Sequence, residues 1–273
     1  MVVASNTRIA KTHVMTSFDV VRQRWAFRCL DSLIHYWAPR NVEIYVYVQN
    51  ATDQVMSVEV PENFHLLTFE KKVPSFYEFQ TRFADKNLKE NYFIFDAIRF
   101  AHKTFAIFEH VKAHRGCEKL VWIDADVELH RPIDRAFEKK VTDPAFDIAF
   151  LDRSELVNPY TKGRRMYPEC GFVVYNLRSK SGKEFIERFA EAYESGRLFE
   201  MAEWHDSFVF QEILDELLKS NRQFRPLNIA NINRVEISDP SHVFVSCILG
   251  EYMDHRKGLR KDLKKSPEFL ERA

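Results

Sequence analysis

Two aspartates, Asp124 and Asp126, follow a short apolar segment near the middle of the chain and stand two positions apart. The segment before them, residues 119–123, is almost continuously apolar and bounded by charge, which is typical of a buried central strand. In an extended strand, residues two positions apart point to the same side, so both carboxylates can bind one hard cation. The spacing by itself favours a metal site no more than a surface strand end, where aspartate pairs are common.

Glycine is scarce, which narrows the ways in which the chain could bind a nucleotide. The first of its seven glycines is Gly116, so no glycine-rich phosphate loop can stand in the early strand-to-helix turns. Ordinary NAD-binding and P-loop signatures are therefore excluded. A nucleotide diphosphate would need another positive partner, and a divalent cation held by carboxylates is the obvious candidate.

The elements that would position the aspartates alternate between strand and helix, which predicts an α/β fold with a mostly parallel central sheet flanked by helices. Hydrophobic periodicity predicts helices at 22–37, 94–114, 182–193 and 205–219. It predicts strands at 12–17, 42–49, 64–69, 119–123, 147–151, 171–175, 225–229 and 242–247, with a polar loop at 152–169. Ligands of such sheets bind where strands end, and Asp124 and Asp126 occupy such a place.

Composition indicates one folded domain and says little about partners. The 273 residues are 45% hydrophobic, enough for a substantial core, while forty basic and forty acidic side chains cancel. The four cysteines have no zinc-like spacing and are expected to be reduced and mostly buried, which favours the cytoplasm. Residues 1–11 lack the apolar stretch of a signal peptide, and no run of about 18 apolar residues predicts a membrane span.

Four further motifs accompany the aspartate pair in a fixed order. Lys103 precedes it on the helix predicted at 94–114, and an apolar strand with Gly171 and Asn176 follows it. Asp206 then stands at a predicted helix start, and the last motif is His255-Arg256-Lys257-Gly258. In this order the motifs resemble those of glycosyltransferases of the GT-A fold, especially the retaining glycogenin and lipopolysaccharide galactosyltransferase family. The resemblance implies a single GT-A domain over residues 1–255, followed by a basic C-terminal tail at 256–273.

The resemblance also implies which residues would bind the metal and the nucleotide sugar. Asp124, Asp126 and His255 would hold Mn²⁺ or Mg²⁺, with Asp124 and Lys103 also near the donor. Lys257 and Gly258 would meet the diphosphate. A solvated helix face remains the alternative for Lys103.

Further residues are implied at the base site and near the acceptor. Thr16, Phe18 and Asp19 stand where these enzymes hold the base and ribose. Asp206, with His205, would act near the acceptor, where a carboxylate can accept a hydroxyl proton or stabilise charge at the anomeric carbon. A helix cap is the alternative for Asp206.

Three residues depart from the family pattern. Thr104 replaces a proline, Glu169 an asparagine that helps to hold the donor sugar, and His205 a glutamine. The identity of the donor sugar therefore does not follow from the resemblance.

Taken together, the motifs predict transfer of a sugar, with retention of configuration, from a nucleotide diphosphate donor, expected to be a UDP-sugar. Inversion with Asp206 as base stays open, as does the acceptor: a glycan, glycolipid, protein or modified nucleic acid. Two other interpretations remain. A haloacid dehalogenase-like phosphatase would use Asp124 as nucleophile and Asp126 as general acid, and a non-catalytic sugar-binding protein would use neither.

The C-terminal segment differs in charge from the rest of the chain. Residues 256–265 hold six basic side chains and one acidic side chain. Such a cluster can dock weakly on an anionic membrane or another polyanion. We therefore expect a cytoplasmic protein that could contact a membrane peripherally, with a solvated helix end as the alternative.

Overall fold

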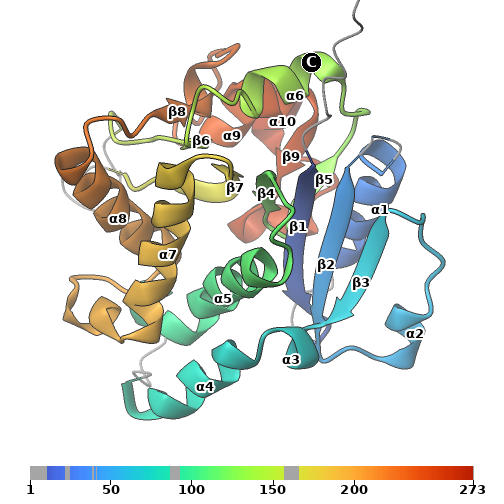
Figure 1. Cartoon of the computed structure of the whole chain (residues 1–273). Helices are drawn as coiled ribbons and strands as arrows, with labels where there is room; N and C mark the ends of the chain where they lie inside the picture. Colours follow the sequence, from blue (N-terminus) through green and yellow to red (C-terminus); the bar gives the residue numbers. More distant parts are fainter. Residues whose placement is uncertain are drawn as a thin grey trace, which may run out of the picture.

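The chain folds around a mostly parallel seven-stranded sheet with the order β3-β2-β1-β4-β7-β6-β8 (Figure 1). The computed structural model describes residues 11–21, 25–38, 40, 42–86, 93–156 and 166–272. The strands are β1 (Thr12–Asp19), β2 (Glu43–Gln49), β3 (Phe64–Thr68), β4 (Lys119–Ile123), β6 (Ile148–Leu151), β7 (Glu169–Asn176) and β8 (Pro226–Asn228). A second, two-stranded sheet pairs β5 (Val127–Leu129) with β9 (Met253–His255).

Strand direction divides the large sheet into two parts. β3, β2, β1 and β4 run parallel to one another, whereas β7 is antiparallel to both β4 and β6. β6 and β8 are again parallel. The predicted α/β class with a mostly parallel sheet is therefore confirmed.

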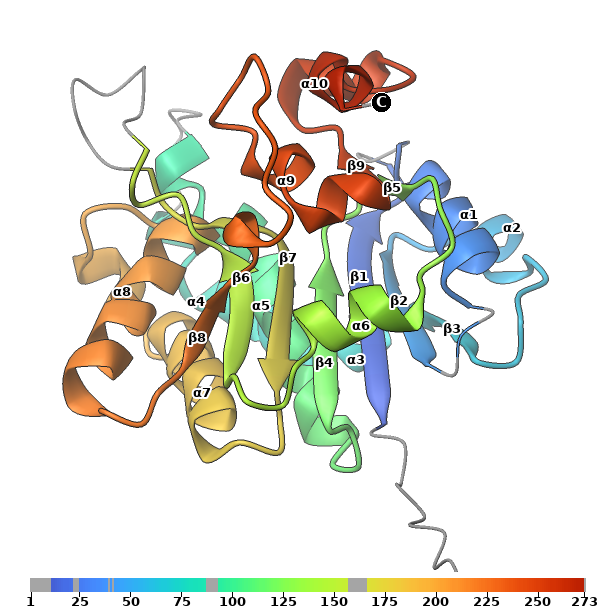
Figure 2. The ribbon, with the colours of Figure 1, turned by 90° about the horizontal axis from the view of Figure 1, so that it is seen from above.

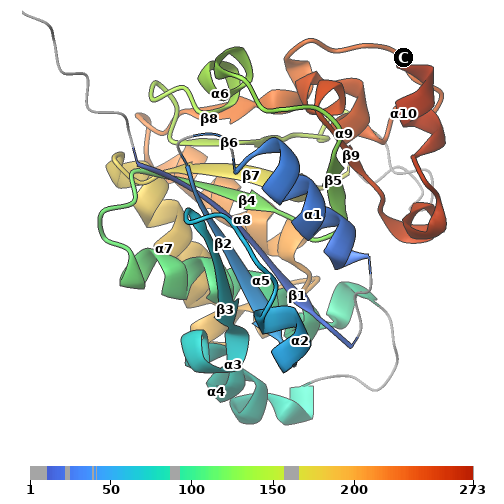
Figure 3. The ribbon, with the colours of Figure 1, turned by 90° about the vertical axis from the view of Figure 1, so that its right-hand side faces the viewer.

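Helices cover both faces of the sheet (Figures 2 and 3). They are α1 (Ala26–Tyr36), α2 (Asp53–Met56), α3 (Phe69–Lys72), α4 (Pro74–Arg82), α5 (Ala97–Ala113), α6 (Arg135–Val141), α7 (Lys180–Glu194), α8 (Asp206–Ser220), α9 (Val243–Ser246) and α10 (Pro267–Glu271). One core contains apolar residues of α1, α6 and α9, and the other contains residues of α4, α5, α7 and α8. Strand β4 contributes side chains to both cores, because successive residues of a strand point to opposite faces: Val121 lies in the first core and Trp122 in the second.

Helix α5 reaches across the sheet and carries a polar side chain toward each edge. Asp96 caps its N-terminus by accepting the Arg99 N–H. Lys103 and His110 are seven residues apart, which is about two turns and about 10 Å, so both lie on one face. Both side chains are among the buried residues of α5. Because α5 returns from the end of one parallel strand to the start of another, Lys103 lies near the carboxyl ends of the strands and His110 near their amino ends.

One predicted element is wrong in type. Residues 242–247 do not form a strand, because Val243 to Ser246 form helix α9, whose four residues are all buried. The N–H groups of Val245 and Ser246 bond to the carbonyl of His242. A short apolar run has no periodicity that separates a strand from a buried helical turn.

Other boundaries differ from the predicted ones, and parts of two predicted elements lie outside the described residues. β7 begins at Glu169, which the sequence predicts in the loop 152–169, and residues 157–165 of that loop are outside the described part. Residues 22–24 of the predicted helix 22–37 are also outside it, and α1 begins at Ala26. The small β5–β9 sheet has no counterpart among the predicted strands. The four cysteines are free and buried, as expected.

The basic segment after β9 packs back against the domain. Arg256 pairs with Glu128, and Arg260 with Asp239 and Glu268. The amide and hydroxyl of Ser266 both donate to the buried Asp254 carboxylate, each at 2.7 Å. Lys264 and Lys265 are exposed. Internal pairing therefore reduces the charge that the segment offers to a polyanion, and membrane docking stays a prediction.

Among the described residues, none of the helices combines the length and apolar character needed to cross a membrane.

Candidate active site

Asp124, Asp126 and His255 come together where β4 ends. The two aspartates lie between β4 and β5, and His255 is the last residue of β9. Antiparallel pairing of β5 with β9 places Val127 opposite His255, so a residue 129 positions from Asp126 becomes its neighbour. One ligand atom from each of the three side chains lies within 4.8 Å of the others. The small sheet thus assembles the metal-ligand set that the resemblance implied.

The aspartates share a site for a different local reason from the one predicted. They occupy a turn rather than extended strand, and the Val127 N–H donates to the Asp124 carbonyl at 3.0 Å. The Asp124 N–H donates to the Gly171 carbonyl of β7 at 2.9 Å. The turn and its hydrogen bond to β7 therefore bring the two carboxylates together, which strand alternation was expected to do.

Asp126 is held between two basic side chains. Its Oδ1 lies 3.0 Å from His255 Nε2, and its Oδ2 lies 3.0 Å from Lys261 Nζ. Burial opposes ionisation of Asp126, but His255 and Lys261 outweigh it and hold the pKa of this carboxyl below its ordinary value. Burial also acts to lower the pKa of His255, yet Asp126 outweighs it, so that pKa is raised. A metal ion bound by both side chains would displace the proton that lies between Asp126 and His255.

Gly171 is required by the position of the His255 ring. A Cβ atom at residue 171 would lie 2.6 Å from His255 Cε1, closer than side-chain atoms normally approach. The imidazole therefore packs directly against the backbone of β7. This contact explains physically why a glycine occurs in the apolar strand that the resemblance singled out.

Lys103 connects Asp124 to Asp206. Its ammonium lies 2.9 Å from Asp124 Oδ1 and 2.9 Å from Asp206 Oδ2, and it donates to the Cys170 carbonyl at 2.6 Å. The solvated-face alternative for Lys103 is wrong, because the residue is only 8% exposed. Trp122 donates its indole N–H to Asp124 Oδ1 at 2.7 Å. Burial raises the pKa of Asp124, against the opposing effect of the Lys103 ammonium.

His205 and Asp206 are neighbours at the N-terminus of α8, but their side chains have different partners. His205 is the N-cap residue, and its Nδ1 accepts the Phe208 N–H at 3.4 Å. Its Nε2 lies 2.8 Å from Glu203 Oε2. The imidazole is thus bonded at both nitrogens, whereas Asp206 turns its carboxylate to Lys103.

Lys257 lies in an ion cluster built around Glu169. Its ammonium pairs with Glu169 Oε2, and Arg153 approaches the same oxygen at 3.1 Å. His255 Nδ1 lies 3.5 Å from Glu169 Oε1. Burial would raise the pKa of Glu169, but Lys257 and Arg153 hold it well below its ordinary value. Glu169, one of the three residues that depart from the family pattern, is therefore the anionic partner of Lys257, the predicted phosphate-binding lysine.

Gly258 follows Lys257 in a left-handed conformation with a φ of 61°. Residues with a Cβ rarely adopt this conformation, whereas glycine does so without strain. A Cβ at this position would meet no atom within 4 Å. The glycine is therefore needed for the backbone turn, and open space lies on that side of the chain.

The predicted base site at the end of β1 is less open than expected. Thr16 and Phe18 are each 1% exposed, and Phe18 belongs to a hydrophobic core. Asp19 accepts N–H groups from Val21 and Asn50, each at 2.9 Å. Stacking of a base on Phe18 would therefore require this side chain to leave the core, and the base site stays a prediction.

Asn176 is in a different place from the other motif residues. It ends β7 opposite Lys119, at the amino end of β4, because β4 and β7 are antiparallel. Its amide donates to the Phe146 and Pro144 carbonyls at 2.9 and 3.2 Å. Asn176 thus fixes a chain turn away from the aspartates.

Among the described residues, side chains that the sequence pattern did not indicate also contact the site, including those of Arg153, Trp122 and Lys261. Arg153 comes from the polar loop and Trp122 from the strand itself. Lys261, over the Trp25 ring at 4.1 Å, comes from the basic segment. The excess of basic residues at 256–265 is the available signal for Lys261, but by itself it indicates only a charged surface. Nothing in the sequence marks Arg153.

Comparison with solved structures identifies the fold. Mouse xyloside xylosyltransferase 1 aligns with a TM-score of 0.52 and 13% identity, covering 87% of this chain and 93% of that one. The chain has a glycosyltransferase fold. Two further matches have TM-scores below 0.5, too low to support an inference. A glycosyltransferase involved in glycosylation of the major capsid of PBCV-1 scores 0.49 at 10% identity, covering 92% of this chain and 95% of that one. GlyE of Streptococcus pneumoniae TIGR4 scores 0.43 at 14% identity, covering 81% and 46%.

No model of a known protein family matches the sequence, and no curated protein matches it by sequence.

Proposed function

We propose that the chain is a metal-dependent glycosyltransferase that moves a sugar from a nucleotide diphosphate donor, a UDP-sugar, to an acceptor. One observation carries the proposal: Asp124, Asp126 and His255 converge at a strand end of a glycosyltransferase fold. Strand ends are where ligands of open α/β sheets bind. The donor, the metal and the retaining stereochemistry belong to the proposal.

The three side chains suit Mn²⁺ or Mg²⁺. Two carboxylates and an imidazole are ligands that hard to borderline divalent ions accept. The Asp126 carboxylate already binds one positive charge, the Lys261 ammonium at 3.0 Å, and this lysine would have to turn away for a metal ion to take its place. When bound, the ion would act as a Lewis acid that stabilises charge on the leaving diphosphate.

Lys257 is proposed to bind the diphosphate by exchanging its partner. It pairs with Glu169, and Arg153 also contacts that carboxylate, so Glu169 would keep a cation after Lys257 turned to phosphate. Open space beside Gly258 allows the backbone to approach the donor. Charge-assisted bonds from the lysine would stabilise the negative charge that grows on the phosphates.

Lys103 is proposed to position Asp124 and Asp206 rather than to bind phosphate. It contacts both carboxylates at 2.9 Å and is buried, so it fixes their relative placement. Asp206 could then orient an acceptor hydroxyl or stabilise charge at the anomeric carbon. Retention is the preferred outcome, and inversion with Asp206 as the base remains the alternative.

Two observations favour the transferase over a haloacid dehalogenase-like phosphatase. The fold aligns with a glycosyltransferase over 87% of this chain. Lys103 and Trp122 also both contact Asp124 Oδ1, which leaves only Oδ2 for the attack that a phosphatase nucleophile would make. A non-catalytic sugar-binding protein would need neither a metal site nor a phosphate-binding lysine.

A donor screen tests the proposal. Purified protein is incubated with Mn²⁺ and UDP-glucose, UDP-galactose or UDP-xylose, the last because the aligned mouse protein is named a xylosyltransferase. We expect metal-dependent thermal stabilisation and slow UDP release with at least one donor, suppressed by a chelator. Phosphate release from a phosphate monoester with no UDP release would favour the phosphatase, and donor binding with no release would favour the sugar-binding protein.

A further inference from the structure

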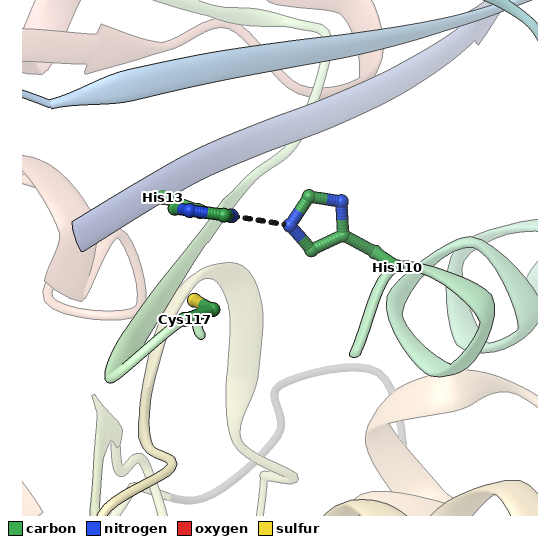
Figure 4. A group of neighbouring side chains, drawn as sticks. All are labelled: His13, His110 and Cys117. Atoms are coloured by element: carbon green, nitrogen blue, oxygen red, sulfur yellow. Dashed lines mark hydrogen bonds between the residues drawn. The ribbon is translucent and has the colours of Figure 1, made fainter. Parts of the chain in front are cut away.

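A second cluster of metal-ligating side chains lies at the other edge of the sheet (Figure 4). It contains His13 from the start of β1, His110 from α5 and Cys117 from the loop before β4. His13 pairs in register with Leu120, at the amino end of β4, whereas Asp124 follows the carboxyl end of that strand. Four residues of extended chain separate these levels, about 13 Å. The cluster is therefore distinct from the site around Asp124.

The spacing of its ligand atoms is compatible with a tetrahedral metal site. His13 Nδ1 lies 2.9 Å from His110 Nε2, and one ligand atom from each side chain lies within 4.8 Å of the others. Bond lengths of about 2.0 Å to nitrogen and 2.3 Å to sulfur place ligand atoms about 3.3 to 3.6 Å apart around zinc. The two nitrogens are closer together than this spacing and the sulfur lies within 4.8 Å of each, so small side-chain movements would bring the three atoms to it.

The surroundings of His110 also favour a ligand. The Tyr47 hydroxyl lies 2.8 Å from His110 Nδ1, and it is the kind of outer partner that fixes the ring of a metal-binding histidine. His110 Nε2 is thereby turned to His13 Nδ1, and both histidines are fully buried. The ion would therefore bind between these two nitrogens.

The chemistry of the ligands selects the ion. A thiolate and two imidazoles suit zinc, whereas Mg²⁺ and Mn²⁺ prefer oxygen. Burial lowers the pKa of His13 to about 4 and that of His110 to about 2, so both rings are neutral and can offer a lone pair. Burial raises the pKa of the Cys117 thiol to about 12, partly opposed by backbone hydrogen bonds at His13 and Lys119. Metal binding would displace this proton.

We propose that His13, His110 and Cys117 form a structural Zn²⁺ site that joins β1, α5 and the loop before β4. The ion would replace the hydrogen bond between the two imidazoles. Its fourth position is left to solvent or to His114, whose ring stacks on His110 with centroids 4.3 Å apart. The site holds together the amino ends of two central strands, so its expected effect is on stability and not on sugar transfer.

Cobalt binding tests the proposal, because Co²⁺ reports a sulfur ligand through charge-transfer absorption in the near ultraviolet. We expect one equivalent of Co²⁺ to produce this band in the full-length wild-type protein and in Asp126→Asn. Zn²⁺ should then displace it. Absence of the band in the wild-type protein would overturn the proposal without recourse to any variant.

Matched cysteine variants locate the site. Cys117→Ser should lose the band, whereas Cys247→Ser, which alters another buried free thiol, should keep it. A band that persists in Cys117→Ser would overturn the proposal.

A stability measurement in the Asp126→Asn background removes the contribution of the first metal site. Zn²⁺ should raise the melting temperature of Asp126→Asn. It should not raise that of the double variant Asp126→Asn/Cys117→Ser, which far-ultraviolet circular dichroism must show to be folded. Equal stabilisation of both proteins would overturn the proposal, and failure of the donor screen would leave it unaffected.

Discussion

The two edges of the central sheet hold polar clusters of opposite character. At the carboxyl edge, Asp124, Asp126 and Glu169 are each paired with a lysine: Lys103, Lys261 and Lys257 respectively. At the amino edge, His13, His110 and Cys117 meet with a tyrosine hydroxyl and no carboxylate among them. The same sheet therefore presents hard, anionic ligands on one side and neutral, softer ones on the other.

The two clusters reduce the free-energy cost of burying polar side chains in different ways. A buried charge is costly unless it is paired, and the carboxyl edge meets this requirement with ion pairs whose partners a charged substrate could exchange. At the amino edge the three clustered side chains are themselves held neutral, because burial drives the pKa values of the two histidines down and that of the thiol up. We therefore expect substitutions at the first edge to affect turnover, and substitutions at the second to affect stability.

The largest effect is expected from Asp126→Asn. The amide cannot supply the anionic oxygen that a hard cation prefers, so Mn²⁺-dependent UDP binding should be lost and turnover should fall by about 100-fold or more. Calorimetry with UDP and Mn²⁺, together with the UDP-release assay, measures both. Asp53→Asn, an exposed carboxylate on α2, is the control and should behave like the wild-type protein. Normal Mn²⁺-dependent UDP binding by Asp126→Asn would remove the metal assignment.

His255→Ala should have the next largest effect. Loss of one ligand should weaken Mn²⁺ affinity by about 10-fold or more, and turnover should fall with it. Titration of Mn²⁺ in the presence of UDP measures the affinity. His242→Ala is a matched control, because the ring of this neighbouring buried histidine bonds to the His255 backbone carbonyl, at 3.2 Å, rather than to an aspartate of the site. Full activity of His255→Ala would leave the aspartate pair as the metal site without its histidine.

Lys257→Ala should act on the donor and not on the metal. Loss of a charge-assisted bond to phosphate should raise the KM for the donor about 10-fold, with Mn²⁺ affinity unchanged. Steady-state kinetics over a range of donor concentrations separates KM from kcat. Lys264→Ala, which removes an exposed lysine of the same segment, should leave KM unchanged. If Lys257→Ala weakened Mn²⁺ binding while sparing KM, the diphosphate assignment would be wrong.

The smallest effect is expected at the amino edge. Tyr47→Phe removes the hydroxyl bonded to His110 Nδ1 and should lower the free energy of unfolding by about 1 kcal/mol, with kcat/KM unchanged. Denaturant unfolding of metal-free protein measures it. Tyr45→Phe removes a hydroxyl from a neighbouring ring that packs near the same histidines, and should cost less. A loss of turnover in Tyr47→Phe would contradict the expectation that substitutions at the amino edge affect stability and not turnover.

The strand and helix pattern was predictable because it depends on local periodicity. Residues 119–123 were predicted as a buried central strand, and β4 has these bounds. The prediction failed at 242–247, where a short apolar run has no periodicity that distinguishes a strand from a buried helix. It also failed to foresee the β5–β9 sheet, because strands of three residues give almost no pattern.

The site was predictable only in part. The aspartate pair could be found from its place after an apolar strand, and His255 only from an ordered resemblance. Glu169 appeared as a departure from the family pattern, and its role as the partner of Lys257 became visible only when β7 and the C-terminal segment were seen together. Lys261 appeared as part of a basic tail, although it contacts Asp126.

The sequence by itself determined the α/β class, the apolar strand that ends at Asp124, and the absence of a glycine-rich phosphate loop, since each depends on neighbours along the chain. Tertiary structure decided the rest. Pairing of β5 with β9 brings His255 to Asp126 across 129 positions, and helix α5 carries Lys103 to one edge and His110 to the other. Such contacts form because distant segments bury shared apolar faces, and local periodicity does not reveal which polar side chains they bring together.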